Sequence, residues 1–241
     1  MRRKQRGVLD RKKYPKHPDS FASPHQTGAP SVNDIVRDPD IEEPPTSKGA
    51  HETRSQIIAG HVTGIMQALD LDLTDENLRD TPRRVAEMYL EVFSSLKDGT
   101  EPKITVFDNT EHYSSMVTVR DIPFYSMCAH HFVPFFGIAH VGYIPTDKIV
   151  GLSKIARIVG FYSRRPQIQE RMAEQVVDFL QDRLSPEGVM VVLEARHMCM
   201  EMRGVKSAGA KTMTDAIRGS FHKLEVRSEF LNLLKTTRWD G

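Results

Sequence analysis

The longest segment rich in β-forming residues is followed directly by a histidine and a cysteine, and the stretch reads Gly188-Val-Met-Val-Val-Leu-Glu-Ala-Arg-His-Met-Cys-Met-Glu-Met202. It predicts one long strand over residues 189–202, and in a strand alternate side chains share a face. One face, continued by one residue, then carries His197, Cys199 and Arg203, while the other carries methionines that we expect to lie in the core. The first face would offer a titratable base, a metal-binding thiol and an anion-binding guanidinium in succession.

The segments around this strand predict a mixed fold. Apolar residues recur at helical spacing in five segments, residues 57–69, 81–96, 153–162, 168–180 and 211–234. Two further segments, 116–120 and 132–144, alternate as strands do or are rich in β-forming residues. Helices, strands, helices, a strand and a helix follow one another without strict βαβ alternation. We therefore expect an α+β fold with a mostly antiparallel sheet.

The composition excludes several classes of protein. The 241 residues suffice for one domain of ordinary size or two small ones, and two cysteines are too few for a disulfide framework. No run approaches the ~18 consecutive apolar residues of a membrane span, and the basic N-terminus lacks the apolar segment of a signal peptide. The net charge of +1 excludes a protein that attracts polyanions over its whole surface. We expect a cytoplasmic protein.

Residues 1–50 differ from the rest of the chain. They hold ten Lys and Arg against seven Asp and Glu, and half of all the prolines, but few large apolar side chains. Such a segment cannot bury enough apolar surface to offset the entropy lost on ordering. We expect a flexible basic, proline-rich extension over residues 1–50 and a folded domain over 51–241. The extension is either a solvated tail or a contact for nucleic acid, an acidic partner or a neighbouring subunit.

The spacing of Cys128 and His131 is that of a metal site. Three residues apart, a thiolate and an imidazole can reach the same ion from one tight turn, and Zn²⁺ accepts both. Cys199 is the only other thiol, and three protein ligands would leave the fourth position for water, as in catalytic zinc sites. His197 lies two residues from it, within reach of that water as a proton shuttle. A buried cysteine beside a half-exposed histidine would explain the same spacing without a metal.

Two further groups of residues are typical of nucleotide recognition. Ser153 at a helix start, with Lys154 and Arg157 in the first turns, would form a phosphate site, although an ordinary helix cap with solvated basic residues has the same pattern. Glu170 could accept two parallel hydrogen bonds from the N–H and amino edge of a guanine-type base. A glutamate near a helix start is also favoured by the helix dipole alone.

Six stretches of the chain carry a more specific signal. They are Ile58-Ala-Gly-His61, Thr81-Pro-Arg-Arg-Val-Ala-Glu-Met-Tyr89, Cys128-Ala-His-His131, Gly151-Leu-Ser-Lys-Ile-Ala-Arg157, Arg165-Pro-Gln-Ile-Gln-Glu-Arg171 and His197-Met-Cys-Met-Glu-Met-Arg-Gly204. In order and separation they resemble the GTP cyclohydrolase I family, over roughly residues 52 to 234. The resemblance implies a tunnelling fold, in which antiparallel strands of several subunits close a barrel with helices outside. It also implies a homodecamer with active sites between subunits.

The resemblance further implies an activity and a set of site residues. The family converts GTP and water into 7,8-dihydroneopterin triphosphate and formate, the entry to folate and pterin pathways. The residues that match its zinc ligands are Cys128, His131 and Cys199, and those that match its catalytic histidines are His130 and His197. The residues that match its substrate-binding groups are Glu170 with Gln169 for guanine, Ser153, Lys154, Arg157 and Arg203 for the triphosphate, and Arg84, which reaches the triphosphate from a neighbouring subunit.

One position departs from the family pattern. Ala129 stands where the family usually has a glutamate between the cysteine and the two histidines. A protein without that carboxylate could halt at the ring-opened formamidopyrimidine intermediate. A third possibility, of another class, is a non-catalytic zinc-fold protein whose basic tail binds nucleic acid. Product analysis after incubation with GTP separates the three.

Overall fold

The computed structural model describes residues 48–96 and 101–235. Almost the whole predicted extension, residues 1–47, lies outside these ranges. The first described element, helix α2 (Lys48–Ala68), begins inside the segment assigned to the extension. No helix in the described ranges is long and apolar enough to cross a membrane.

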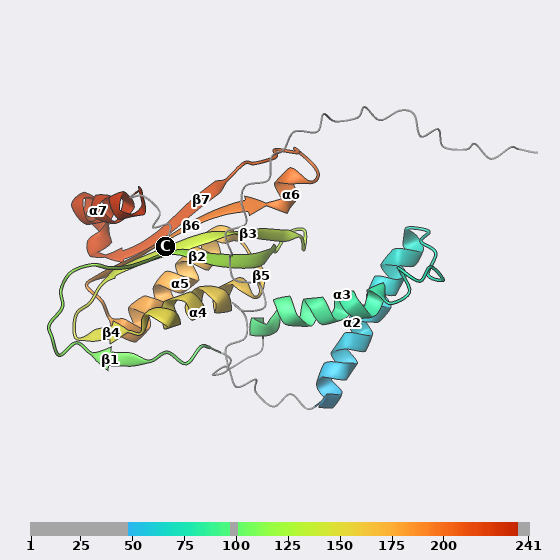
Figure 1. The fold of residues 1–241 in the computed structure, drawn as a ribbon, viewed down its shortest axis with the longest axis horizontal. Helices are drawn as coiled ribbons and strands as arrows, with labels where there is room; N and C mark the ends of the chain where they lie inside the picture. The colour runs from blue at the N-terminus through green and yellow to red at the C-terminus, as the bar shows by residue number, and fades with distance from the viewer. Residues whose placement is uncertain (1–47, 97–100, 236–241) are drawn as a thin grey trace, which may run out of the picture. The chain divides into compact units, whose positions relative to one another are not determined.

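A five-stranded curled sheet is the centre of the fold (Figure 1). Its strands, in the spatial order β5-β2-β3-β6-β7, are β5 (Pro166–Gln167), β2 (Val117–Cys128), β3 (Pro134–Ile144), β6 (Gly188–His197) and β7 (Thr212–Gly219). Every neighbouring pair is antiparallel except β2 with β5. A separate antiparallel pair joins β1 (Val106–Asp108) to β4 (Lys148–Val150). The predicted α+β class with a mostly antiparallel sheet is confirmed.

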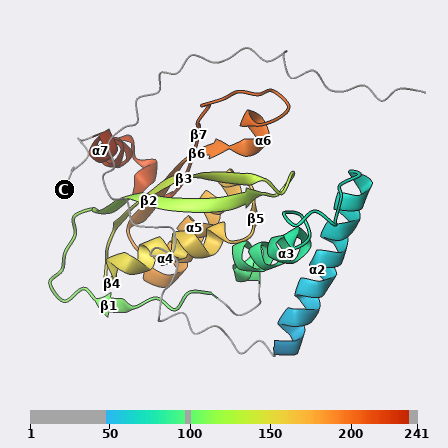
Figure 2. The ribbon, with the colours of Figure 1, turned by 45° about the vertical axis from the view of Figure 1, so that its right-hand side comes forward.

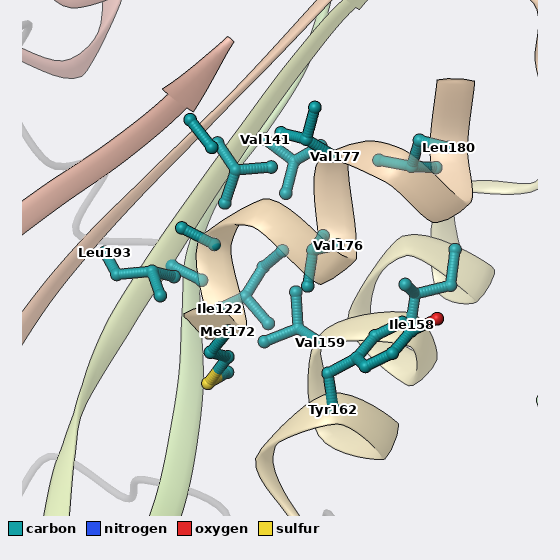
Figure 3. Close-up of a cluster of buried hydrophobic side chains, with 14 of the residues drawn as sticks. Ile122, Val141, Ile158, Val159, Tyr162, Met172, Val176, Val177, Leu180 and Leu193 are labelled. Carbon is teal, nitrogen blue, oxygen red and sulfur yellow. The ribbon is translucent and has the colours of Figure 1, made fainter. Parts of the chain in front are cut away.

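Two helices, α4 (Leu152–Ser163) and α5 (Gln169–Leu184), cover one face of this sheet (Figure 2). Strand β6 shows why, because its side chains alternate between two clusters of buried residues. Val191 and Leu193 belong to the larger cluster with α4 and α5, while Val192 belongs to a smaller cluster on the other face. Figure 3 shows side chains of the larger cluster, labelled Ile122, Val141, Ile158, Val159, Tyr162, Met172, Val176, Val177, Leu180 and Leu193.

Helix α7 (Leu224–Lys235) takes part in the smaller cluster. Its Phe230 is fully buried and packs against Gly142 of β3, where a Cβ atom would lie 2.7 Å from the ring. The sequence predicted a helix over the whole of 211–234, and this is wrong for its first half. Residues 212–219 form β7, because they pair with the length of β6 from Ala195 back to Gly188. The short turn Ser220–His222 then leads into α7.

The long strand predicted to Met202 ends earlier, at His197. The chain then forms one helical turn, α6 (Met198–Glu201), so Cys199 and Arg203 do not share a strand face with His197. The reason is pairing, because β3 pairs with β6 only as far as Phe135 opposite His197. On the other side, the pairing with β7 stops at Ala195. Beyond these points no ladder partner remains, and methionine and glutamate favour helix.

The helices α2 and α3 (Thr81–Val92) confirm two predicted helices, and Pro82 lies in the first turn of α3 as expected. Met66 of α2 is buried, but other apolar side chains of its predicted inner face are not. Ile57, Ile65 and Leu69 are 56%, 60% and 65% exposed. Within the described part of one chain, α2 therefore presents an uncovered apolar surface.

We predict that Gly137→Ala destabilises the fold, because Gly137 of β3 lies opposite Ala195 of β6, two residues before His197. A Cβ atom at Gly137 would overlap the carbonyl oxygen of Glu194 and lie 2.7 Å from Cα of Ala195, and neither backbone atom can move without breaking the β3–β6 ladder. We expect the free energy of unfolding to fall by about 3 kcal/mol or more in urea titrations.

Gly160→Ala in α4 is the matched control, because nothing lies within 4 Å of its added carbon. It should be neutral or stabilise by up to about 1 kcal/mol, and equal losses in both variants would contradict the prediction.

Candidate metal centre and catalytic site

Three side chains from separate parts of the chain converge at one end of the sheet. Cys128 ends β2, His131 lies in the turn that follows, and Cys199 lies in α6. Their ligand atoms all lie within 4.8 Å of one another. The sequence predicted this trio, but it placed Cys199 on a strand, whereas the helical turn after β6 brings it to the other two.

The turn after Cys128 is fixed by backbone hydrogen bonds. The Cys128 carbonyl accepts from the N–H of His131 at 3.3 Å and of Phe132 at 2.9 Å, and its own N–H donates to the Val133 carbonyl. Phe132 has a φ of +52°, which closes the turn. The Ala129 N–H donates to the Gln167 carbonyl of β5 at 2.8 Å. These bonds hold the first two donor groups before any ion arrives.

The two thiols favour a shared cation. Burial raises the pKa of the Cys199 thiol, and the neighbouring Cys128 raises it further. Two thiolates this close repel one another, and a divalent cation between them removes that repulsion. Two sulfurs with one imidazole form a donor set that soft or borderline divalent metals accept. The trio could therefore hold a metal ion.

Two basic side chains, His130 and Arg203, border the trio. His130 has its Nδ1 atom 4.0 Å from the Cys128 sulfur, and within the trio the Nδ1 atom of His131 lies 3.8 Å from the same sulfur. Arg203 approaches the opposite nitrogen of His131, with Nη1 3.3 Å from Nε2. An ion on Nδ1 would leave Nε2 protonated, and a protonated Nε2 cannot accept from Arg203. Metal binding at that atom would therefore free Arg203 for an anionic ligand.

His197, the last residue of β6, is held on two sides. Its ring stacks on Phe135 of β3 with centroids 4.7 Å apart and planes 2° from parallel. Its Nε2 atom lies 2.7 Å from Oε1 of Gln169, at the start of α5. Burial lowers the pKa of His197, and the nearby Glu170 carboxylate partly opposes this. Burial thus favours the neutral form of the imidazole, and the two contacts orient the ring, as a group that accepts a proton requires.

The residues expected to bind phosphate lie at the start of α4, whereas the end of α4 contacts β2 near Cys128. Helix α4 begins at Leu152 with Gly151 as its cap residue, so Ser153 lies inside the first turn and does not cap the helix. Lys154 also lies in this turn. The last residue of α4, Ser163, accepts a hydrogen bond at 2.7 Å from Ser126, two residues before Cys128. At 1.5 Å per residue, Ser153 lies about 15 Å along the helix from that end.

Three further expected residues lie on helices. Arg157 follows on the next turn of α4, and Glu170 is exposed in the first turn of α5. Arg84 of α3 is exposed, with a carboxylate oxygen of Asp80 3.6 Å away. Within the described ranges, His130 and Arg203 therefore contact members of the metal trio, and His197 contacts Gln169. Among the described residues, Ser153, Lys154 and Arg84 make no hydrogen bond or ion pair with Cys128, His131 or Cys199.

Sequence reasoning missed two residues that shape the site. Phe135 supports the His197 ring, and the buried Gln167 donates to the Tyr162 carbonyl and to Gln175, which holds β5 beside Cys128. Both roles depend on strand register. No spacing within the sequence signals which residue of β3 lies opposite His197.

Comparisons with known proteins agree with these observations. The family model described as GTP cyclohydrolase I matches residues 58–235. A protein of Geobacillus sp. (strain WCH70) named GTP cyclohydrolase 1 is 54% identical over 174 residues, 71% of this chain and 92% of its own length. Proteins of the same name from Halalkalibacterium halodurans and from Dehalococcoides mccartyi (strain ATCC BAA-2100) are 52% and 49% identical. Their matches span 78% and 75% of this chain, and 99% and 96% of the relatives. The chain belongs to the GTP cyclohydrolase I family.

Proposed function

We propose that this protein hydrolyses and rearranges GTP to 7,8-dihydroneopterin triphosphate and formate. The observation that carries the proposal is the convergence of Cys128, His131 and Cys199 near the end of β6, where Gln169 and Phe135 orient His197. A purely structural metal site needs no such histidine. Family membership and the names of the relatives support the same reaction.

We propose zinc as the metal. Cys128, His131 and Cys199 would hold the ion through two sulfurs and a nitrogen, which are ligands that Zn²⁺ prefers, and three protein ligands are typical of catalytic zinc sites. When bound there, zinc would supply water activated for hydrolysis by lowering its pKa towards ~7.

The side chains of the chain supply the rest of the chemistry. His197 takes up a proton from the attacking water and passes it to the imidazole-ring nitrogen of the purine as the ring opens at carbon 8, and His130 assists a later proton step. Glu170 accepts hydrogen bonds from the guanine edge, while Arg203, Ser153, Lys154, Arg157 and Arg84 bind the triphosphate. Holding the base and the triphosphate at opposite ends fixes carbon 8 against the metal site, and such positioning accounts for a large share of the rate.

We further propose that the active site is shared between copies of the chain in the tunnelling fold. Two observations support this assembly. The start of α4 lies about 15 Å along the helix from the end that meets the strand of Cys128, so a second copy can supply the triphosphate residues. The apolar surface of α2 and the edge strand β7 lack a cover within the described chain. We propose a homodecamer whose catalytic domain spans residues 51–241, working in the cytoplasm, where both free thiols stay reduced.

A second candidate, a reaction that halts at the ring-opened formamidopyrimidine, is favoured by one observation. Ala129 lies between the ligand Cys128 and His130, and its methyl group offers no carboxylate to orient either histidine or a water. Ring opening would proceed, and release of formate would fail. A non-catalytic protein that binds nucleic acid through its tail is the least supported, because it gives the oriented His197 no role.

The experiment is incubation of the zinc-loaded full chain with GTP, followed by mass spectrometry of the products and assay of formate. The full reaction predicts formate and, after oxidation, a fluorescent pterin. Formamidopyrimidine without formate would establish the shortened reaction, and Ala129→Glu should then restore formate. Unchanged GTP in the presence of bound zinc would reject both enzyme proposals.

A further inference from the structure

The side chain of Gln169 is buried where the helix layer meets the sheet. It is 2% exposed and begins α5. Its Nε2 atom donates to two backbone carbonyls, that of Leu193 on β6 at 3.1 Å and that of Thr212 on β7 at 3.0 Å. Both amide hydrogens are therefore committed. The orientation of the amide is also fixed, because the flipped group would place its oxygen against two carbonyl oxygens.

This fixed amide determines the hydrogen-bonding state of His197. The oxygen Oε1 of Gln169 can only accept, and it lies 2.7 Å from Nε2 of His197. Nε2 must therefore carry the hydrogen, and in the neutral ring the lone pair is then on Nδ1. Rotation of the ring by 180° would place a carbon atom against Oε1 and lose the bond. The parallel stack on Phe135 holds the plane of the ring.

We propose that Gln169 is a positioning residue, which sets the tautomer and orientation of His197 so that Nδ1 is the atom that meets the substrate. The proposal rests on the proposed function, since it concerns the proton transfer assigned to His197. It differs from the role in guanine binding that the family resemblance implies. A side chain that is 2% exposed, with both hydrogens on backbone carbonyls, has no donor left for a base.

The first test replaces the amide by an apolar side chain of similar length, Gln169→Met. His197 then loses its hydrogen-bond acceptor, and both tautomers and ring orientations become available. Misplacement of a catalytic group costs up to ~10²-fold in rate, so we expect kcat for GTP to fall by about that factor while KM stays within about twofold. A residue that held guanine would instead raise KM.

The matched control is Gln181→Met on the same helix. Gln181 is partly buried and lies three turns of helix beyond Gln169, and its side-chain oxygen has no hydrogen-bond partner among the described residues. The same chemical change there should leave kcat and KM at their wild-type values. Thermal melting of both variants then shows whether the loss of kcat accompanies a loss of folded protein.

A second variant, Gln169→Glu, separates positioning from a structural role. Methionine and glutamate both lose the amide that donates to the two carbonyls, but only glutamate keeps an oxygen for Nε2–H of His197. We expect Gln169→Glu to retain a kcat at least about tenfold above that of Gln169→Met, the lower end of the 10- to 100-fold that hydrogen-bond partners of metal-bound histidines contribute. Equal losses in both variants would mean that Gln169 only joins α5 to the sheet, and would overturn the proposal.

The outcomes also separate this inference from the proposed function. If the wild-type protein with bound zinc leaves GTP unchanged, the proposed function fails and takes the inference with it. If the wild type turns over GTP but Gln169→Met raises KM at unchanged kcat, only the inference is overturned. A fall in kcat at constant KM, with rescue by glutamate, supports it.

Discussion

Cys199→Ser is expected to empty the metal site and to abolish GTP turnover. Among the described residues, the side chain of Cys199 contributes one of the three donor atoms of the site, all within 4.8 Å of one another. Serine is close in shape, but its hydroxyl ionises far less readily than a thiol and is a poor ligand for Zn²⁺. Metal activation of water is worth several kcal/mol of barrier, so we expect the rate to fall by roughly 10³-fold or more. Elemental analysis should find far less than one zinc per chain, with the fold retained by circular dichroism.

The matched control for this substitution is Met200→Ser in the same turn, α6. Met200 is 36% exposed and is not among the donor atoms. It should bind zinc and turn over GTP at rates close to those of the wild type. If Cys199→Ser kept a full complement of zinc and normal activity, Cys199 would not be a ligand and the site described here would be wrong.

His197→Gln is expected to bind zinc and GTP normally and yet lose turnover by ~10²- to 10⁴-fold, the usual contribution of a general acid or base. Glutamine can still donate a hydrogen bond to Oε1 of Gln169, so that buried acceptor keeps its partner. It has no nitrogen lone pair with which to take up a proton. Turnover of GTP by the zinc-loaded variant, with zinc content measured in parallel, checks the prediction.

The exposed His222 provides the control, because His222→Gln makes the same change on the turn after β7, outside the residues of the site. Its kcat should equal that of the wild type. Loss of zinc together with activity in His197→Gln would show that His197 supports the metal rather than the proton transfer. Activity retained in both variants would remove His197 from the mechanism.

Four helices of this fold, α2, α3, α4 and α5, could be predicted from the sequence because each has a regular apolar pattern. The segments around Val62, Val85, Ile158 and Val176 all form helices. The apolar spacing of α2 nevertheless predicted burial that one chain does not provide. Periodicity identifies a face that needs covering, but it does not say which surface covers it.

The ends of the strands could not be predicted because they depend on pairing between distant residues. His197 ends β6 because β3 and β7 offer no further partners, and Thr212 begins β7 because Ala195 of β6 pairs with it. Side-chain pattern alone favoured a strand to Met202 and a helix from residue 211. Both errors arose where tertiary pairing overrides local preference.

The convergence of Cys128, His131 and Cys199 could be predicted from the sequence, whereas the residues that support them could not. Cys128 and His131 have a recognisable spacing, and Cys199 is the only other cysteine in the chain. The roles of Phe135 and Gln169 arise from strand register and from the start of α5. Ser153 was expected to cap its helix, but α4 begins at Leu152 and Gly151 is the cap residue.

X-ray absorption at the zinc edge of the purified full chain determines whether Cys128, His131 and Cys199 bind zinc. We expect one zinc per chain, coordinated by two sulfurs at about 2.3 Å and by two lighter atoms at about 2.0–2.1 Å, the imidazole nitrogen and a water oxygen. A protein isolated without a transition metal, or a coordination shell without sulfur, would contradict it.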